Sequence, residues 1–203
     1  MATRRRSGSC VVNNPLFILQ TLDRHLDHPV ELTLYGRAAL ALGFPSREPR
    51  HETTQDVDAI IPLAQLDQLR ADTQFWDARD ATNAELLERG LYLTHLFTEA
   101  DVFLLPDWLN RCVSIPSNFI HLKLRRPATL DLILTKMMRG ADPEDLSDIA
   151  FLLKHEPVKD AELRAAFDRV RLPDIQELRD AFRAAQPKVL ALAKAQGPMR
   201  TPS

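Results

Sequence analysis

The chain has 203 residues, of which 45% are hydrophobic and 27% charged, so it has enough apolar material to bury a sizeable core. Its formal net charge of −2 excludes the global basic field that would by itself indicate nucleic-acid binding, while local basic patches stay open. The two cysteines, Cys10 and Cys112, stand far apart without metal-ligand spacing, which argues against a disulfide framework and favours a reducing compartment.

The two ends show no targeting or membrane-spanning pattern. After the basic start MATRRR, the residues Asn13, Asn14 and Pro15 interrupt the apolar run that a secretory signal needs. No apolar run approaches the roughly 20 residues of a membrane span. We therefore expect a cytoplasmic protein with no membrane partner, and we interpret Arg4 to Arg6 and the end QGPMRTPS as polar tails.

The first part of the chain alternates helical and strand-like patterns, and Asn14-Pro15 is typical of a helix start. The elements predicted here, in chain order, are a helix to Leu26, a strand Val30–Tyr35, a short helix Gly36–Gly43, a loop Pro45–Thr54, a strand Asp56–Ile61, helices Pro62–Ala71 and Phe75–Glu88, a hairpin of strands Leu91–Phe97 and Asp101–Leu105, a helical turn Asp107–Arg111, and strands Val113–Ile115 and Phe119–Leu124. Within the loop, Arg47, Arg50 and His51 can close over a triphosphate or RNA, or simply be solvated.

After Pro127 every periodic segment is helical. The predicted helices are Thr129–Arg139, Pro143–His155, Asp160–Val170 and Pro173–Ala195. The chain is therefore predicted to be an α/β (α+β) protein, with a mixed sheet and flanking helices in residues 1–126 and a C-terminal helical bundle in residues 127–203 packed on that core.

Two aspartates lie in a segment that otherwise has the pattern of a buried strand. Residues i and i+2 of a strand face the same side, so Asp56 and Asp58 project together while Val57 points into the core. Neighbouring carboxylates repel each other unless they share a proton or bind a divalent cation. Oxygen ligands on a rigid strand suit Mg²⁺ or Mn²⁺ together with substrate phosphates. Alternatively, Asp56 only caps the start of the strand.

The glycine upstream supplies the second half of a candidate site. A helix that begins directly after a strand offers free N–H groups and a positive dipole end to a phosphate, and Gly36 permits close approach there. Its plainer role is to make the tight turn between strand and helix. Asp101, at the start of DVFLL, is a candidate third carboxylate for a two-metal phosphoryl-transfer site, or an edge residue of a turn.

The order strand, glycine, short helix, polar loop and Asp-x-Asp resembles the nucleotidyltransferase superfamily with the polymerase-β-like fold. The segment LDLILTKMMRGADPEDLSDIAFLL, from Leu130 to Leu153, is similar to the helical part of abortive-infection and toxin-type nucleotidyltransferases. The resemblance covers roughly Glu31 to Leu153. It implies a minimal nucleotidyltransferase sheet with helices, a nucleoside triphosphate substrate, and either a toxin that acts on RNA or tRNA beside a cognate antitoxin protein, or an enzyme that modifies another acceptor.

The resemblance also implies roles for individual residues. Asp56, Asp58 and Asp101 would hold Mg²⁺ or Mn²⁺, and Asp101 is the candidate base. Gly36 would lie near the nucleotide phosphates, and Lys136 would meet the triphosphate.

Three further residues of the helical segment match the family pattern, namely Arg139, Asp145 and Asp148. Lys136 borders the apolar face of its helix, from which a lysine can reach a phosphate or extend into solvent. Asp145 and Asp148 share one helix face, and an ion pair of Asp148 with Lys136 or Arg139 is the favoured interpretation over direct chemistry.

Arg37 departs from the family pattern, which has a small residue after the glycine. A long cationic side chain there can bind a phosphate or block the nucleotide-binding site. The alternative function is therefore a catalytically inactive nucleotidyltransferase-fold module that binds or regulates, and a weaker one is a structural domain whose acids only form ion pairs.

Overall fold

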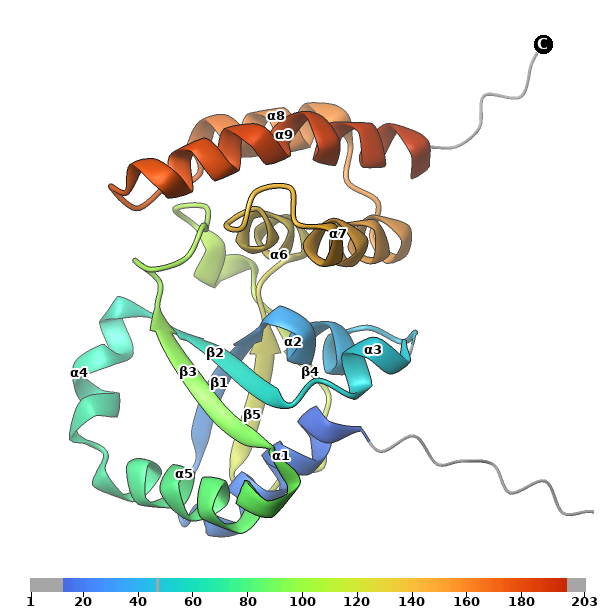
Figure 1. Ribbon diagram of the computed structural model, residues 1–203. Coiled ribbons are helices and arrows are strands. Elements are labelled where there is room, and N and C mark those ends of the chain that lie inside the picture. The colour runs from blue at the N-terminus through green and yellow to red at the C-terminus, as the bar shows by residue number, and fades with distance from the viewer. Residues whose placement is uncertain (1–12, 47, 197–203) are drawn as a thin grey trace, which may run out of the picture.

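The computed structural model describes residues 13–46 and 48–196. The expectations for Arg47 and for both tails lie outside these residues. Within them, five strands form one mixed sheet with the order β3-β2-β1-β5-β4 (Figure 1). The strands are β1 (Val30–Tyr35), β2 (Asp56–Ile61), β3 (Tyr92–Thr98), β4 (Val113–Ile115) and β5 (Leu122–Arg126).

The central strand β1 is antiparallel to β2 and parallel to β5. The outer pairs are β2 with β3, which are parallel, and β4 with β5, which are antiparallel. The predicted mixed sheet with flanking helices, and hence the α/β (α+β) fold class, is confirmed.

The helices are α1 (Asn14–His25), α2 (Gly36–Gly43), α3 (Pro49–Glu52), α4 (Leu63–Ala71), α5 (Thr73–Leu86), α6 (Thr129–Lys136), α7 (Pro143–His155), α8 (Asp160–Arg169) and α9 (Gln176–Gln196). In Figure 1, α1 and α5 lie toward the bottom of the view, α4 lies at the left of the sheet, and α6 to α9 lie above the sheet. The pair α6 and α7 lies above α2 and α3, and α8 and α9 lie above that pair. None of the helices within residues 13–46 and 48–196 is long and apolar enough to cross a membrane.

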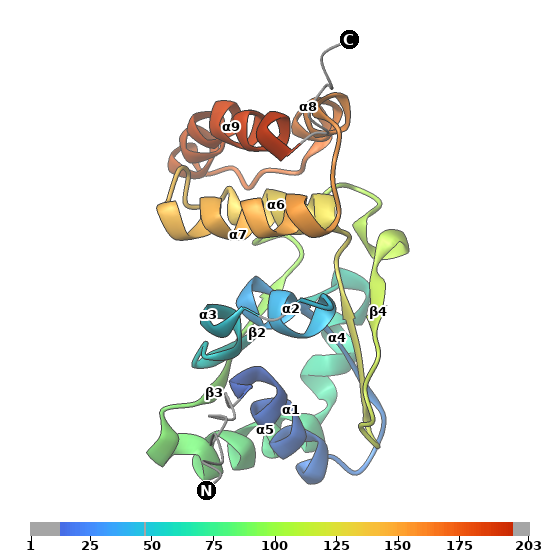
Figure 2. The same ribbon diagram turned by 90° about the vertical axis from the view of Figure 1, so that its right-hand side faces the viewer.

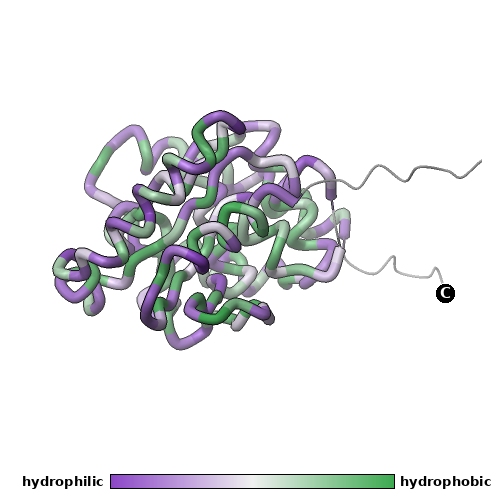
Figure 3. The backbone as a smooth tube through the Cα atoms, turned by 90° about the horizontal axis from the view of Figure 1, so that it is seen from below, coloured by the Kyte–Doolittle hydropathy of each residue, from purple (hydrophilic) through white to green (hydrophobic). Residues whose placement is uncertain are grey.

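One cluster of buried side chains runs through the sheet and the C-terminal helices. Leu32 and Leu34 of β1, Ile133 of α6 and Leu152 of α7 are fully buried members of it. Phe103 touches Phe182 of α9 edge to face, with ring centroids 5.5 Å apart. Hydrophobic segments cross the middle of the molecule and hydrophilic segments lie around them (Figure 3). The helical region is thus packed on the sheet region through a shared core.

The predicted hairpin is wrong in its second strand. Thr98 to Asp101 form a turn closed by the bond from the Asp101 N–H to the Thr98 carbonyl at 3.0 Å. The following segment makes only an isolated bridge, between Leu104 and Arg171. Its backbone therefore finds partners in the C-terminal region, which the local pattern did not indicate.

Several element boundaries also differ from the prediction by a few residues, among them the start of β5 and the end of α6. The last strand begins at Leu122 instead of Phe119, because the Asp23 carboxylate accepts the N–H groups of residues 120 to 122 at 2.8–2.9 Å. Helix α6 ends at Lys136 instead of Arg139. The side chain that caps α1 is Asn13, which accepts the Leu16 N–H at 2.9 Å, and not Asn14.

The predicted loop Pro45–Thr54 contains the short helix α3. Pro49 stands at its first position, where a missing N–H is harmless and the fixed φ suits the helix. Helix α3 lies next to α2 in the views of Figures 1 and 2, so the loop adds residues to the region under α7.

Candidate active site

A cleft of about 360 Å³ lies where the ends of β1 and β2 meet the start of α2 and the helices α6 and α7. Its lining residues are Tyr35, Gly36, Arg37, Thr54, Asp56, Asp58, Thr135, Lys136, Met138, Arg139, Glu144 and Asp145. Of the residues predicted from the sequence, the cleft gathers Gly36, Arg37, both aspartates of β2, Lys136 and Arg139. Segments far apart in the chain therefore converge on one site.

The carboxylates of Asp56 and Asp58 form the sheet side of the cleft. Both are half-buried, as expected for alternate residues of one strand, whereas Val57 between them is fully buried. Thr54 donates its hydroxyl to Asp56 Oδ1 at 2.8 Å, and Thr94 donates its hydroxyl to Asp58 Oδ1 at 3.1 Å. These bonds orient the two carboxylates, while the remaining carboxylate oxygens keep acceptor capacity for a ligand.

A bulge in β3 brings two residues to Asp58. Val57 pairs with Leu93 and Ala59 with Leu96, so Thr94 and His95 together stand opposite Asp58. His95 Nδ1 lies 3.4 Å from Asp58 Oδ1, and its exposed ring stacks on Phe97 with centroids 5.1 Å apart.

Gly36 turns the chain from β1 into α2 with a left-handed φ of 62°. Other residues rarely adopt this φ, so the strand-to-helix turn itself requires glycine. A Cβ atom here would lie 3.6 Å from Asp58 Oδ2, which places the start of α2 beside that carboxylate. The free N–H groups of the first helical turn therefore open next to the two aspartates.

Burial and like charge raise two pKa values on the sheet side. The pKa of Asp58 lies above its ordinary value, first because of burial and then because Asp56 is close, while the hydroxyl of Thr94 partly opposes the shift. Tyr35, which pairs with Asp58 across β1 and β2, also has a raised pKa, because of burial and then the negative charge of Asp58. This side of the cleft therefore favours a gain of positive charge.

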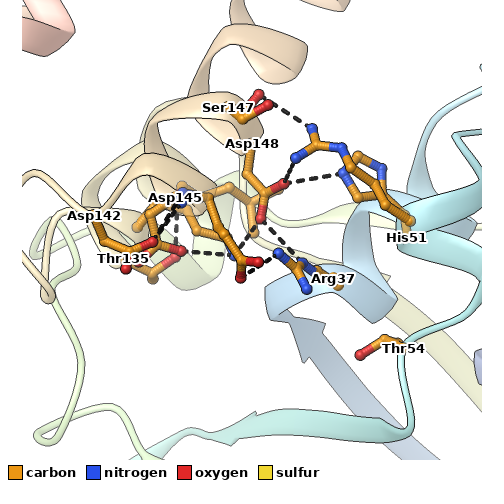
Figure 4. Close-up of polar contacts among 12 residues, drawn as sticks. Arg37, His51, Thr54, Thr135, Asp142, Asp145, Ser147 and Asp148 are labelled. Atoms are coloured by element: carbon orange, nitrogen blue, oxygen red, sulfur yellow. Dashed lines mark hydrogen bonds and ion pairs between the residues drawn. The ribbon is translucent and has the colours of Figure 1, made fainter.

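Arg37 extends from α2 toward α7 (Figure 4). Its Nη2 lies 2.8 Å from Glu144 Oε2, and its Nε lies 3.6 Å from Asp148 Oδ2. The guanidinium thus lines the cleft beside the start of α2 and is paired with carboxylates of α7.

The cations of the helical side are held by α7 (Figure 4). Lys136 Nζ lies 2.7 Å from Asp148 Oδ2 and 3.2 Å from Asp145 Oδ1. Arg139 Nε donates to Asp145 Oδ2 at 2.7 Å. The ion pair of Asp148 with Lys136, which the sequence favoured, is present. The N-cap Asp142 accepts the N–H groups of residues 144 and 145 and so fixes the first turn of α7.

Two residues of the predicted solvated loop also contact Asp148. Arg50 Nη1 lies 2.9 Å and His51 Nε2 lies 3.0 Å from Asp148 Oδ1, and His51 is fully buried. Burial opposes the charge of Asp148, yet the bond from His51 and the charge of Lys136 lower the pKa of this carboxyl. Asp148 lies outside the cleft lining, where it positions cations that do line it.

Asp101 lies apart from the cleft lining. Its Oδ2 accepts the N–H of Thr98 at 3.0 Å and the hydroxyl of Thr98 at 2.6 Å, so the carboxylate closes its own turn. Among the residues that the structure describes, no three His, Cys, Asp or Glu side chains are grouped to hold a metal ion. The role of Asp101 as a third ligand stays a prediction.

The pair Asp56 and Asp58 fits a partly hydrated Mg²⁺ or Mn²⁺, because such ions take one or two carboxylates together with water and substrate phosphates. The raised pKa of Asp58 is consistent with this donor set, since a bound cation would relieve the repulsion between the two carboxylates. The start of α2 lies on the same side of the cleft, where phosphate oxygens would complete the ligands.

Tyr35, Thr54, Thr94 and His95 were not assigned to the site from the sequence. Thr54 stands two residues before Asp56, and Tyr35 directly precedes Gly36, so proximity to the motifs was an available signal for both. Thr94 and His95 reach Asp58 only through the bulge, for which the sequence of β3 has no signal. A scan of family models, a search of curated proteins and a search of solved structures found no match to this chain.

Proposed function

We propose that the chain is a Mg²⁺- or Mn²⁺-dependent nucleotidyltransferase that moves a nucleoside monophosphate from a nucleoside triphosphate to an acceptor hydroxyl. The observation that carries the proposal is the single cleft that joins Asp56 and Asp58, the start of α2 at Gly36, and the cations Lys136 and Arg139. Metal-binding carboxylates on one side and phosphate-binding groups on the other are the two halves that phosphoryl transfer needs.

Each group of residues has a distinct task in this proposal. Asp56 and Asp58 would hold the divalent cation, which would supply charge neutralisation at the phosphates when bound. The backbone N–H groups at Gly36 would receive a phosphate at the positive end of α2. Lys136 and Arg139 would bind the outer phosphates, which leave as pyrophosphate while the acceptor oxygen bonds to the α-phosphorus.

The proposal keeps three acceptor classes: RNA or tRNA, protein, and small molecules. The net charge of −2 weighs mildly against a large RNA footprint. A toxin role with a cognate antitoxin protein follows only from the resemblance of Leu130 to Leu153 to toxin-type nucleotidyltransferases. Location in the cytoplasm is likewise part of the proposal, supported by cysteine usage.

A second candidate function is a catalytically silent module, and one observation favours it. Lys136, Arg139 and Arg37 each already bind a carboxylate of α7, so these cations have partners without a nucleotide. In such a module the ion pairs would hold α7 against α2 and α6, and no phosphate would enter.

Transfer of label separates the two candidates. Each α-³²P-labelled nucleoside triphosphate is incubated with the protein, Mg²⁺ and a cell extract, which is then separated into RNA, protein and small molecules. We expect label in one fraction, and its loss in Asp56→Asn and Asp58→Asn. Asp77→Asn, an exposed aspartate of α5, is the control. Equal labelling by wild type and both variants, or no labelling by any of them, would contradict the proposal.

A further inference from the structure

Arg37 is held between two carboxylates of α7 that differ in exposure. Asp148, 3.6 Å from Arg37 Nε, has a fully buried side chain, whereas the side chain of Glu144, 2.8 Å from Arg37 Nη2, is 65% exposed. Asp148 is also fixed by Lys136. Glu144 therefore has far more freedom to leave Arg37 than Asp148 has, because an exposed ion pair contributes little to stability.

The balance of charges in the cleft lining also indicates that Glu144 is the carboxylate that leaves. The lining holds three cations, Arg37, Lys136 and Arg139, against four carboxylates, Asp56, Asp58, Glu144 and Asp145. A triphosphate would therefore meet an excess of negative charge.

Of the two carboxylates that α7 contributes to the cleft lining, only Glu144 can leave its cation at a low cost in free energy. Asp145 is almost fully buried between Lys136 and Arg139. Glu144 contacts only the guanidinium of Arg37 among the ion pairs of the described residues, and it lines the cleft with a largely exposed side chain.

We infer that Glu144 is a displaceable counter-anion for Arg37, whose place a triphosphate group takes when it binds. The inference rests on the proposed function and deepens it. Asp148 keeps Arg37 aimed at the cleft through Nε, while the terminal nitrogens exchange Glu144 for phosphate oxygens, to which a guanidinium binds in a fork. Arg37, which departs from the family pattern, is then a phosphate-binding residue and no obstacle, and Glu144 sets the affinity for polyphosphate.

A structural role for Glu144 predicts a different behaviour. Glu144 lies in the first turn of α7, where a carboxylate favours the helix dipole. Glu177 has the same placement in the first turn of α9, it is exposed, and it lies outside the cleft lining. Glu177→Gln is therefore a control matched in chemistry, net charge and helix position.

The test is calorimetric binding of inorganic tripolyphosphate without divalent cations at constant ionic strength. We expect Glu144→Gln to bind about three- to fivefold more tightly than wild type, the range that corresponds to loss of one exposed ion pair. Glu177→Gln should match wild type. Arg37→Gln should bind more weakly, and adding Glu144→Gln to it should restore little, because the two changes remove the same interaction. Melting temperatures verify that each variant is folded.

Equal or weaker binding by Glu144→Gln, a gain that persists in the Arg37→Gln background, or no binding by any variant would overturn the inference. The transfer assay separates this failure from that of the proposed function. If label is transferred in a manner that requires Asp56 and Asp58 while Glu144→Gln has no effect on binding, only the inference fails. If Glu144→Gln gains affinity but no label is transferred, the anion site stands and the enzyme assignment fails.

Discussion

Asp58 and Asp148 are carboxylates on opposite sides of one region, and their pKa values shift in opposite directions. Asp148 is the more buried of the two, yet its pKa is lowered, because His51, Lys136 and Arg50 outweigh the cost of burial. Asp58 keeps some exposure, yet its pKa is raised by burial and by Asp56. Burial alone therefore does not set the charge of a carboxylate in this fold, and the number of cations within reach decides it.

The two sides of the cleft differ in how their charges are compensated. On the helical side, α7 supplies a carboxylate for each cation that lines the cleft. On the sheet side, Asp56 and Asp58 accept the hydroxyl groups of Thr54 and Thr94, and the ring of His95 lies 3.4 Å from Asp58 Oδ1. The cations of the helical side are thus already compensated by carboxylates of the protein. The carboxylates of the sheet side would be stabilised by an added cation.

The largest expected effect is the loss of Asp148. Asp148→Asn leaves Lys136 and Arg50 without their fully buried anion, so we expect the free energy of unfolding to fall by about 3 kcal/mol. Urea unfolding measures the change. Asp168→Asn, an exposed aspartate of α8, should change it by less than about 0.5 kcal/mol. Equal stability of the two variants would show that Asp148 does not anchor the cations of the helical side.

The opposite sign is expected at Asp58. Asp58→Asn keeps an acceptor for Thr94 and removes a charge that burial and Asp56 disfavour, so without divalent cations the free energy of unfolding should rise by about 0.5–1 kcal/mol. Urea unfolding in a chelating buffer measures it, with Asp77→Asn as the control. Millimolar Mg²⁺ should stabilise wild type more than Asp58→Asn. A destabilised variant would show that the carboxylate is already compensated.

The contributions of Asp148 and Asp58 to stability are expected to depend on pH in opposite directions. The folded-state pKa of Asp148 is lowered from the ordinary value of 3.8, so its stabilisation is present above pH 3.8 and is lost as the pH falls through the folded pKa. The folded-state pKa of Asp58 is raised, so its favourable contribution is present below 3.8 and is lost as the pH rises through the folded pKa.

Unfolding free energies between pH 3 and 7 check both signs. The cost of Asp148→Asn should be largest near neutral pH and should shrink toward pH 3. The gain from Asp58→Asn should be absent near pH 3 and should grow as the pH rises. Differences from wild type that do not vary with pH would contradict both shifts.

At Asp101, where structure and sequence lead to different expectations, we expect a small loss of stability and little effect on nucleotide transfer. Its carboxylate closes the turn at Thr98, so Asp101→Asn should lower stability by about 0.5–1 kcal/mol and leave nucleotide transfer within a few-fold of wild type. Thermal unfolding and the transfer assay measure the two quantities. A loss of transfer comparable to that of Asp58→Asn would instead establish Asp101 as the third ligand predicted from the sequence.

Much of the fold could be predicted because local signals and tertiary demands agree. The alternation of Val30–Tyr35 and the break at Gly36 predicted β1 and the start of α2 at their observed bounds. The prediction failed where a distant group supplies the backbone partners. Asp23 accepts N–H groups just before and at the start of β5, and Arg171 bridges Leu104, and neither contact is visible in a local pattern.

The contacts of the candidate site were likewise predictable in part. The spacing of Asp56 and Asp58 indicated a shared face, and the short distance between Lys136 and Asp148 in the chain made their ion pair predictable. The contacts of Arg50 and His51 with Asp148 were not predictable, because they depend on how α3 docks under α7. The bulge that brings His95 to Asp58 depends likewise on the register of β2 and β3.

The α/β character, most element types and the residues able to carry charge follow from the sequence, because periodicity, turn residues and capping act within a few positions of the chain. The pairing of these charges follows from the packing of the folded chain. This packing joined Arg37 to Glu144 and Asp148, placed Asp56 and Asp58 in one cleft, and kept Asp101 outside the cleft lining. The reason is physical: the state of a charge depends on its neighbours in space, and here they come from distant segments that only the packing of α7 over α2 and α3 brings together.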